Sequence, residues 1–272
     1  MTHRFFEGKE HASIYQTYRF PPPDGLKNII LQYLDNKKGQ PHELAVDLGC
    51  GTGQNCQLLA PHFEEVVGMD VSECQLDEAR AVQSCPNITY RKGTAEELPF
   101  SHNSVDLLTA ASAAHWFDQD RFLAEASRVL KPRGCMALLG YSDMSSKLHY
   151  KNCGEQLTHI YKEVKQTLMP HTNNRVAVCD NKLEDLYAAI TFPDKERIEY
   201  TEANHLISLR NLMGFIETWS AFQTYKKKDP KSAQDLLLNT QDRFLAVMAV
   251  TSLDTELKWE LEYYCVLASK PQ

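Results

Sequence analysis

The chain lacks several features that would assign it to a metal-binding, membrane or secreted class. None of its eight cysteines forms a C-x-x-C pair, and no group of cysteines and histidines has the spacing of a zinc site. No apolar run approaches the roughly 20 residues of a transmembrane helix, and the N-terminus has no apolar signal-peptide segment. We therefore expect a cytoplasmic protein with free thiols, no metal and no membrane partner.

Positive charge is also scarce. The chain carries 29 Lys and Arg against 36 Asp and Glu, a formal net charge of −7. Its basic clusters, such as residues 226–228, are short and are typical of solvated helix ends. This balance argues against a nucleic-acid partner, since the phosphate backbone selects basic surfaces.

The middle of the chain alternates short apolar runs with amphipathic segments. This alternation predicts an α/β fold with a parallel, doubly wound sheet, because strand–helix–strand units connect parallel neighbours. The expected strands are 44–48, 66–69, 88–92, 105–111 and 135–140, and the expected helices are 54–60, 73–82 and 119–130.

The two ends of the chain follow other patterns. Residues 1–42 hold a helical pattern that begins at Asp24, which is available as an N-cap. Residues 145–190 are helical in periodicity and predict a cap inserted over the sheet edge. After them we expect a strand at 197–206, helices at 209–227 and 232–250, and a final strand at 259–269. We expect a single domain over 1–272, with a cofactor-binding core at 43–141 and a C-terminal part at 197–272.

Three glycines at alternate positions separate the first strand from its helix. Gly49, Gly51 and Gly53 let the backbone turn sharply and approach a ligand closely, and the helix after them presents free N–H groups to an anion. The second strand ends in Asp70, at the edge where an acid accepts hydrogen bonds from ribose hydroxyls. Together they predict a nucleoside site.

The glycine spacing distinguishes between nucleosides. The third glycine follows the first by four positions, whereas the dinucleotide fingerprint needs five, so a nicotinamide oxidoreductase is disfavoured. With Asp47 two residues before the first glycine, the pattern resembles motif I of the class I S-adenosylmethionine-dependent methyltransferases. The resemblance implies an enzyme of the EC 2.1.1 class with a Rossmann-like, seven-stranded, mostly parallel sheet. It also implies S-adenosyl-L-methionine as cofactor and S-adenosyl-L-homocysteine as product.

The resemblance extends to the cofactor contacts. In that family the glycine loop contacts the methionine end of the cofactor. The acid before the loop orients both the loop and the cofactor's amino group, and the acid after the second strand holds the ribose. Residues 93–100 resemble the segment that reads adenine, with Glu97 as an alternative acid to Glu96. The alternative roles are loop hydrogen bonding for Asp47 and helix capping for Asp70. The implied cofactor-binding residues in the sheet are Asp47, Gly49, Cys50, Gly51, Gly53, Asp70, Val71, Ala95, Glu96 and Ala111.

Residues 104–117 end in a run of small residues followed by His115 and Trp116. This run resembles the trans-aconitate and related small-molecule carboxylate methyltransferases, and it lacks the Asn-Pro-Pro-aromatic motif of base-modifying ones. His115 and Trp116 are therefore the candidate catalytic residues, although both also suit a structural role. A carboxylate acceptor needs no general base, whereas a phenol, an amine or a carbon acid needs one, and His115 has a suitable pKa range.

Two further segments resemble the same group. Residues 15–20 resemble a family segment that closes over the cofactor, which makes residues 1–42 a lid segment, with Tyr18 and Arg19 as cofactor contacts and Tyr15 as a substrate contact. Within 215–225, Trp219 and Tyr225 are candidate substrate residues. The alternative for all of them is packing on the sheet or in the core.

The leading hypothesis is a cytoplasmic methyltransferase that acts on a small molecule, most simply on a carboxylate oxygen. The alternatives are methylation of a protein or of nitrogen, sulfur or carbon in a small molecule, and an inactive binding protein with the same fold. We expect a monomer or a weak homodimer.

Overall fold

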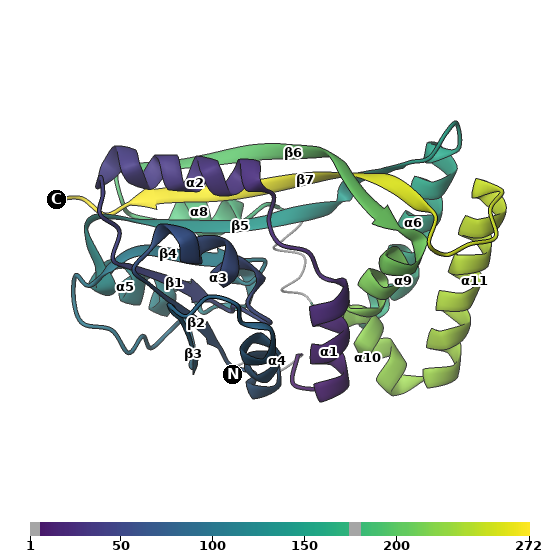
Figure 1. Ribbon diagram of the computed structural model, residues 1–272, viewed down its shortest axis with the longest axis horizontal. Coiled ribbons are helices and arrows are strands. Elements are labelled where there is room, and N and C mark those ends of the chain that lie inside the picture. Colours follow the sequence, from purple (N-terminus) through teal and green to yellow (C-terminus); the bar gives the residue numbers. More distant parts are fainter. Residues whose placement is uncertain (1–5, 174–180) are drawn as a thin grey trace.

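The computed structural model describes residues 6–173 and 181–272 and contains one seven-stranded sheet (Figure 1). The strand order is β3-β2-β1-β4-β5-β7-β6. Strand β7 is antiparallel to the other six strands, which all run in the same direction. This is the mostly parallel α/β sheet that the sequence predicts. The strands are β1 (Leu44–Leu48), β2 (Glu65–Asp70), β3 (Ile88–Lys92), β4 (Val105–Ala111), β5 (Leu130–His149), β6 (Asp194–Ser208) and β7 (Glu256–Ser269).

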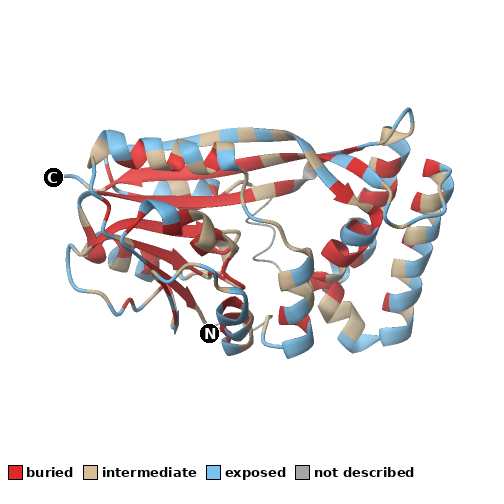
Figure 2. Cartoon of the chain, viewed as in Figure 1, coloured by how far each residue is buried: buried red, intermediate tan, exposed pale blue. Residues whose placement is uncertain are grey.

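Helices cover both faces of the sheet, which explains why the central strands are apolar at nearly every position. Along β1, Ala45 packs into the core on one face and Val46 into the core on the other. The red, buried residues of Figure 2 therefore fill the central strands. The first face carries α2 (Asp24–Lys37), α3 (Gln54–Leu59) and α4 (Glu73–Val82), with the short helix η1 (Ala60–His62) after α3. The second carries α5 (Gln119–Val129) and α8 (Glu184–Ala189).

Three long strands extend beyond this core to a group of helices at the far end of the molecule (Figure 1). β5, β6 and β7 lead to α6 (Gly154–Leu168), η3 (Met169–His171), α9 (Leu209–Glu217), α10 (Ser220–Lys228) and α11 (Pro230–Met248). The N-terminal helix α1 (Lys9–Tyr18) packs against both α4 and α9, so it lies between the core and this helical part. No helix among the described residues has the length and apolarity to cross a bilayer.

Several sequence-based boundaries differ from those of the structure, and β5 already begins at Leu130. β5 continues past residue 140 to His149 because β7 pairs with it as far as Lys258, so the helical segment expected from 145 begins at Gly154. The helix expected over 209–227 is two helices, because Trp219 has extended backbone angles between them. Asp24 is the first residue of its helix and Pro23 takes the cap position without a side-chain bond. Residues 174–180 of the expected cap lie outside the described residues.

The described cysteines are all free thiols, as the sequence predicts.

Candidate functional site

Three adjoining cavities lie at the carboxyl ends of the parallel strands. Cavity A, of about 120 Å³, lies over β1, β2 and β4, and cavity B, of about 60 Å³, lies between the glycine loop, β5 and residues 15–22. Cavity C, of about 270 Å³, lies between the end of β4 and helices α6 and α10. Tyr15 and Ser112 are the two described residues that line all three cavities. The cavities therefore meet at these two side chains.

The glycine loop forms one wall of cavities A and B. Gly49 has a φ of +64°, and a Cβ there would lie 2.5 Å from the Cβ of Ala113, so no larger residue fits. At Gly51, with a φ of +55°, a Cβ would meet nothing closer than 3.6 Å, from Gln75 and Tyr15. The missing side chain at Gly51 thus leaves ligand-accessible space beside the backbone. The loop fits a close backbone approach to a nucleoside.

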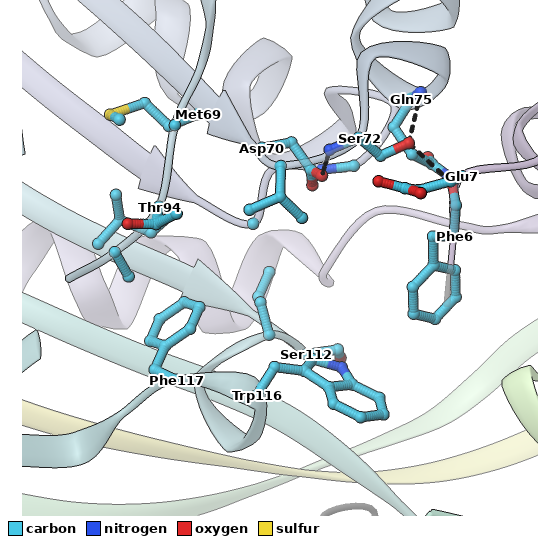
Figure 3. Close-up of a pocket in the computed structure, with 18 of the residues that line it drawn as sticks. Phe6, Glu7, Met69, Asp70, Ser72, Gln75, Thr94, Ser112, Trp116 and Phe117 are labelled. Atoms are coloured by element: carbon cyan, nitrogen blue, oxygen red, sulfur yellow. Dashed lines mark hydrogen bonds between the residues drawn. The ribbon is translucent and has the colours of Figure 1, made fainter. Parts of the chain in front are cut away.

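Asp70 holds this loop from the end of β2. Its two carboxylate oxygens accept hydrogen bonds from the backbone N–H of Gly51, at 2.9 Å, and of Ser72, at 2.8 Å. Burial raises the pKa of Asp70, and these backbone bonds oppose the shift. Ser72, not Asp70, caps α4, since its hydroxyl accepts from the N–H of Gln75. The carboxylate of Asp70 and the neighbouring Val71 line cavity A (Figure 3).

Asp47 lies beneath the loop and lines cavity B. It is buried and accepts hydrogen bonds from the Asn55 amide at 2.8 Å, the Thr109 hydroxyl at 2.7 Å and the Cys56 thiol at 3.5 Å. Burial raises the pKa of Asp47 to about 6, and the three donors only partly offset the loss of water. A buried carboxylate of this kind is suited to an ammonium group in the cavity. Cys50 and Ala111 also line cavity B.

The far end of cavity A is formed by the segment after β3. Ala95 and Glu96 both line it, while Glu97 does not and instead pairs with Thr94 in an isolated bridge. Glu96 accepts a hydrogen bond from the backbone N–H of Asp118 at 2.9 Å, which fixes its carboxylate against the start of α5.

His115 and Trp116 lie in the short helix η2 (Ala114–Trp116) at the end of β4. Both line cavity C, and Trp116 also lines cavity A, where Figure 3 shows it below Ser112. The opposite wall includes Trp219 and Lys165 from the helical part. Lys165 lies 5.5 Å from the Trp219 ring.

Arg19 connects cavities B and C. Its guanidinium lies between the rings of Tyr15, at 4.8 Å, and Phe215, at 4.5 Å. It donates to the Thr218 hydroxyl at 2.8 Å and to the Tyr141 hydroxyl. The rings and bonds fix a cation beside the same cavity that Asp47 lines. Among the described residues that line cavity B, Asp47 thus provides a carboxylate and Arg19 a cation, which complement the two charges of an amino acid moiety.

Three of the expected site residues line none of these cavities. The ring of Tyr18 lies against Gly214 and packs α1 on α9, and Tyr225 stacks on His171 at a centroid distance of 4.5 Å. Gly53 precedes α3 with a φ of +86°, and a Cβ there would lie 2.2 Å from the Tyr90 hydroxyl, so both the backbone and the packing require glycine. Their positions follow from helix packing that a single sequence does not encode locally.

The sequence reasoning also missed several residues that line the cavities. They include Phe6, Gln54, Gln75, Ser112, Tyr141 and Lys165. Ser112 lies within residues 104–117, the segment that the sequence assigns to the acceptor side. Its φ of +55° is unusual for a residue other than glycine. Lys165 gave no signal, because it reaches the site only through the packing of α6.

Comparisons with known proteins agree with a methyltransferase fold. A family model described as a methyltransferase domain matches residues 46–138. A Dictyostelium discoideum protein named as a methyltransferase is 26% identical over 94% of this chain and 92% of its own length. A trans-aconitate 2-methyltransferase from Deinococcus radiodurans is 38% identical, but over only 36% of this chain and 38% of its own length. A structure described as a type II methyltransferase from Anaeromyxobacter dehalogenans has a TM-score of 0.72 and 24% identity, covering 94% of this chain and 100% of that one.

Proposed function

We propose that this chain, which is a class I S-adenosylmethionine-dependent methyltransferase, methylates a carboxylate oxygen of a small molecule bound in cavity C. The observation that carries the proposal is the charge of that cavity. Among the described residues that line it there is no Asp or Glu, while Arg19, Lys165 and His115 all line it. Such a wall favours an anionic acceptor. The matched segment of the trans-aconitate enzyme supports the same acceptor class.

In this proposal the cofactor occupies cavities A and B. Asp70 accepts hydrogen bonds from the ribose hydroxyls, and Ala95 with Glu96 borders the adenine. Asp47 faces the amino group of the methionine moiety and Arg19 its carboxylate, with the glycine loop between them. Gln54, which lines cavity B, supports this placement because its side-chain N–H₂ group is buried without a partner within the described chain.

The reacting centre then lies where the three cavities meet, at Tyr15 and Ser112. The bound cofactor supplies a methyl group that is already activated as a sulfonium substituent. The chain's own residues orient the acceptor and exclude water, and orientation of this kind contributes roughly 7–11 kcal/mol to such reactions. Trp116, Trp219 and Tyr15 form the apolar walls that keep water out.

A carboxylate acceptor reacts without losing a proton, so His115 acts by positioning it. Its imidazole lines cavity C without lining cavity A or B, on the acceptor side of the junction. Trp116 lies between the two sides, since it lines both cavity A and cavity C.

A second candidate is methylation of an amine, and a specific observation favours it. The wall of cavity C is rich in aromatic rings, including Tyr141, Trp219 and Tyr264, and such walls attract organic cations. The cationic side chains in the same wall oppose a cationic acceptor, so we place this candidate second.

A matched series of acceptors tests the proposal. One carbon skeleton is offered as the acid, the primary amide, the alcohol and the amine, and the product is identified by its mass gain and fragmentation. The proposal predicts turnover of the acid alone, and Lys165→Met should raise the KM for that acid. Lys162→Met, a charge loss on the same helix at a residue outside the cavity lining, serves as the control. Turnover of the amine alone would replace the proposal by the second candidate.

We further propose that the protein works in the cytoplasm as a monomer or weak homodimer with a small molecule, and not a nucleic acid, as its substrate. The net charge of −7 supports the last point. Light scattering of the purified protein tests the oligomeric state, and an acceptor assay with tRNA and DNA tests the substrate.

A further inference from the structure

Gln75 is a buried polar side chain with no partner inside the described protein. It lies in the first turn of α4, which follows Asp70 in the chain, and it is only 1% exposed. Both its side-chain oxygen and its side-chain nitrogen are buried and without a hydrogen bond to residues 6–173 or 181–272. Leaving a primary amide unsatisfied in this way destabilises a protein, so native structures rarely retain one without a function.

The amide of Gln75 borders cavity A. Its side-chain oxygen lies 3.6 Å from the position that a Cβ on Gly51 would take, on the open side of the glycine loop. Gln75 and Asp70 line the same cavity, and Figure 3 shows them on neighbouring parts of its wall, with Ser72 between them.

The two side chains offer complementary hydrogen-bonding groups. An ionised Asp70 only accepts hydrogen bonds, whereas the amide of Gln75 both donates and accepts. A ribose diol has two O–H donors and two oxygens that accept. The carboxylate of Asp70 accepts hydrogen bonds from the O–H groups of the diol. The oxygens of the diol still need a donor, which the side-chain N–H₂ group of Gln75 supplies.

We propose that Gln75 is a cofactor-recognition residue that donates a hydrogen bond to a ribose hydroxyl of the bound cofactor, alongside Asp70. The cofactor then satisfies the amide that the protein alone leaves unpaired. This inference rests on the proposed placement of the cofactor in cavities A and B, and it does not depend on the identity of the methyl acceptor.

The proposed hydrogen bond is tested by a double-mutant cycle that combines a change in the protein with a change in the ligand. Gln75→Met removes the hydrogen-bonding groups and nearly keeps the volume. We expect it to weaken binding of S-adenosylhomocysteine about tenfold in calorimetry. The 2′-deoxy or 3′-deoxy analogue that lacks the recognised hydroxyl should lose less affinity, relative to the parent ligand, in Gln75→Met than in the wild type, because the variant has already lost the bond to the amide and only the bond to Asp70 remains to be lost.

A second measurement separates recognition from structural support. Because the variant removes an unsatisfied buried amide, the ligand-free protein should melt at the same or a higher temperature. A structural role for Gln75 would instead lower the melting temperature and weaken both deoxy analogues as much as the parent ligand, and that result overturns the proposal. Gln83→Met, a change at the end of the same helix and outside the cavity lining, is the matched control and should leave the affinity unchanged.

Gln75→Glu provides an independent variant that keeps the shape of the side chain. It replaces the donor by an acceptor close to Asp70, so it should weaken S-adenosylhomocysteine more than Gln75→Met does. Equal affinity of Gln75→Glu and the wild type would also overturn the proposal.

Discussion

The hydroxyl of Ser72 donates a hydrogen bond of 2.8 Å to the carbonyl oxygen of Phe6. This bond joins the N-terminal segment to the start of α4, next to Asp70. The Phe6 ring also makes an edge contact with Trp116, and Phe6 lines both cavity A and cavity C (Figure 3). One residue thus lines both the proposed cofactor cavity and the proposed acceptor cavity.

Replacing this ring should therefore affect both ligands. Phe6→Ala is expected to weaken S-adenosylhomocysteine about tenfold, because it exposes apolar surface at the cofactor cavity, and to raise the KM of the acceptor as well. Calorimetry and steady-state kinetics measure the two effects. Leu238→Ala removes an exposed apolar side chain in α11 and should change neither. A change confined to one ligand would contradict the shared role of Phe6.

Asp70 should dominate cofactor affinity. Asp70→Ala removes the carboxylate that holds Gly51 and Ser72, and with it the acceptor for the ribose hydroxyls. Since hydrogen bonds to a charged group contribute about 1.5–3 kcal/mol each, we expect affinity to fall by about 100-fold or more. Asp77→Ala, on the exposed face of α4, is the control. Unchanged affinity in Asp70→Ala would remove the ribose assignment.

The raised pKa of Asp47 predicts that cofactor binding depends on pH. Its folded pKa of about 6 lies above the ordinary 3.8, so the folded state binds this proton more tightly than the unfolded chain does. Its contribution to stability is therefore present below about pH 4, declines as the pH rises towards 6, and is lost above that. A cofactor ammonium beside Asp47 favours the carboxylate form and lowers this pKa.

Binding of S-adenosylhomocysteine should consequently release about half a proton near pH 6 and almost none at pH 8. Calorimetry in buffers of different ionisation enthalpy measures this release. 5′-Methylthioadenosine, which lacks the amino group, should release none at either pH. Equal proton release by the two ligands would show that Asp47 does not face the ammonium group.

Substitution of His115 tests whether the acceptor has to lose a proton to react. If the acceptor is a carboxylate, His115→Gln should retain kcat within about tenfold and mainly raise the KM, because no proton has to be removed. If His115 acts as a general base, kcat should fall by about 10²–10⁴-fold. A pH–rate profile of the wild type gives a second readout, since positioning alone leaves no acid limb that depends on His115.

The sequence predicted the core of the fold because that core is locally encoded. β1, β2 and β4 are short, largely apolar runs, and helices follow them closely in the sequence, so the apolar pattern alone locates them. The long ends of β5 and β7 could not be found in this way, because the pairing of Leu148 with Trp259 joins residues that are far apart in the sequence. The same holds for the break before α10.

The residues of the candidate site likewise fall into those that a local motif predicts and those that long-range packing places. Gly49, Gly51 and Asp70 belong to a short motif whose spacing carries its meaning, and the structure brings them to one cavity. Tyr18 and Tyr225 come from two segments that resemble the family, and this resemblance does not tell a cavity wall from a helix contact. Gln75 and Lys165 entered the site through the packing of α4 and α6, which only the three-dimensional structure reveals.

The most direct test of the proposed reaction uses cofactor with a tritiated methyl group and a panel of small carboxylic acids. A methyl ester releases volatile tritiated methanol on treatment with alkali, whereas methyl groups on nitrogen, carbon or ether oxygen stay with the product. We predict that transferred label becomes volatile after alkali, and that Lys165→Met reduces its amount at low acceptor concentration. Label that is transferred but stable to alkali would contradict carboxylate methylation.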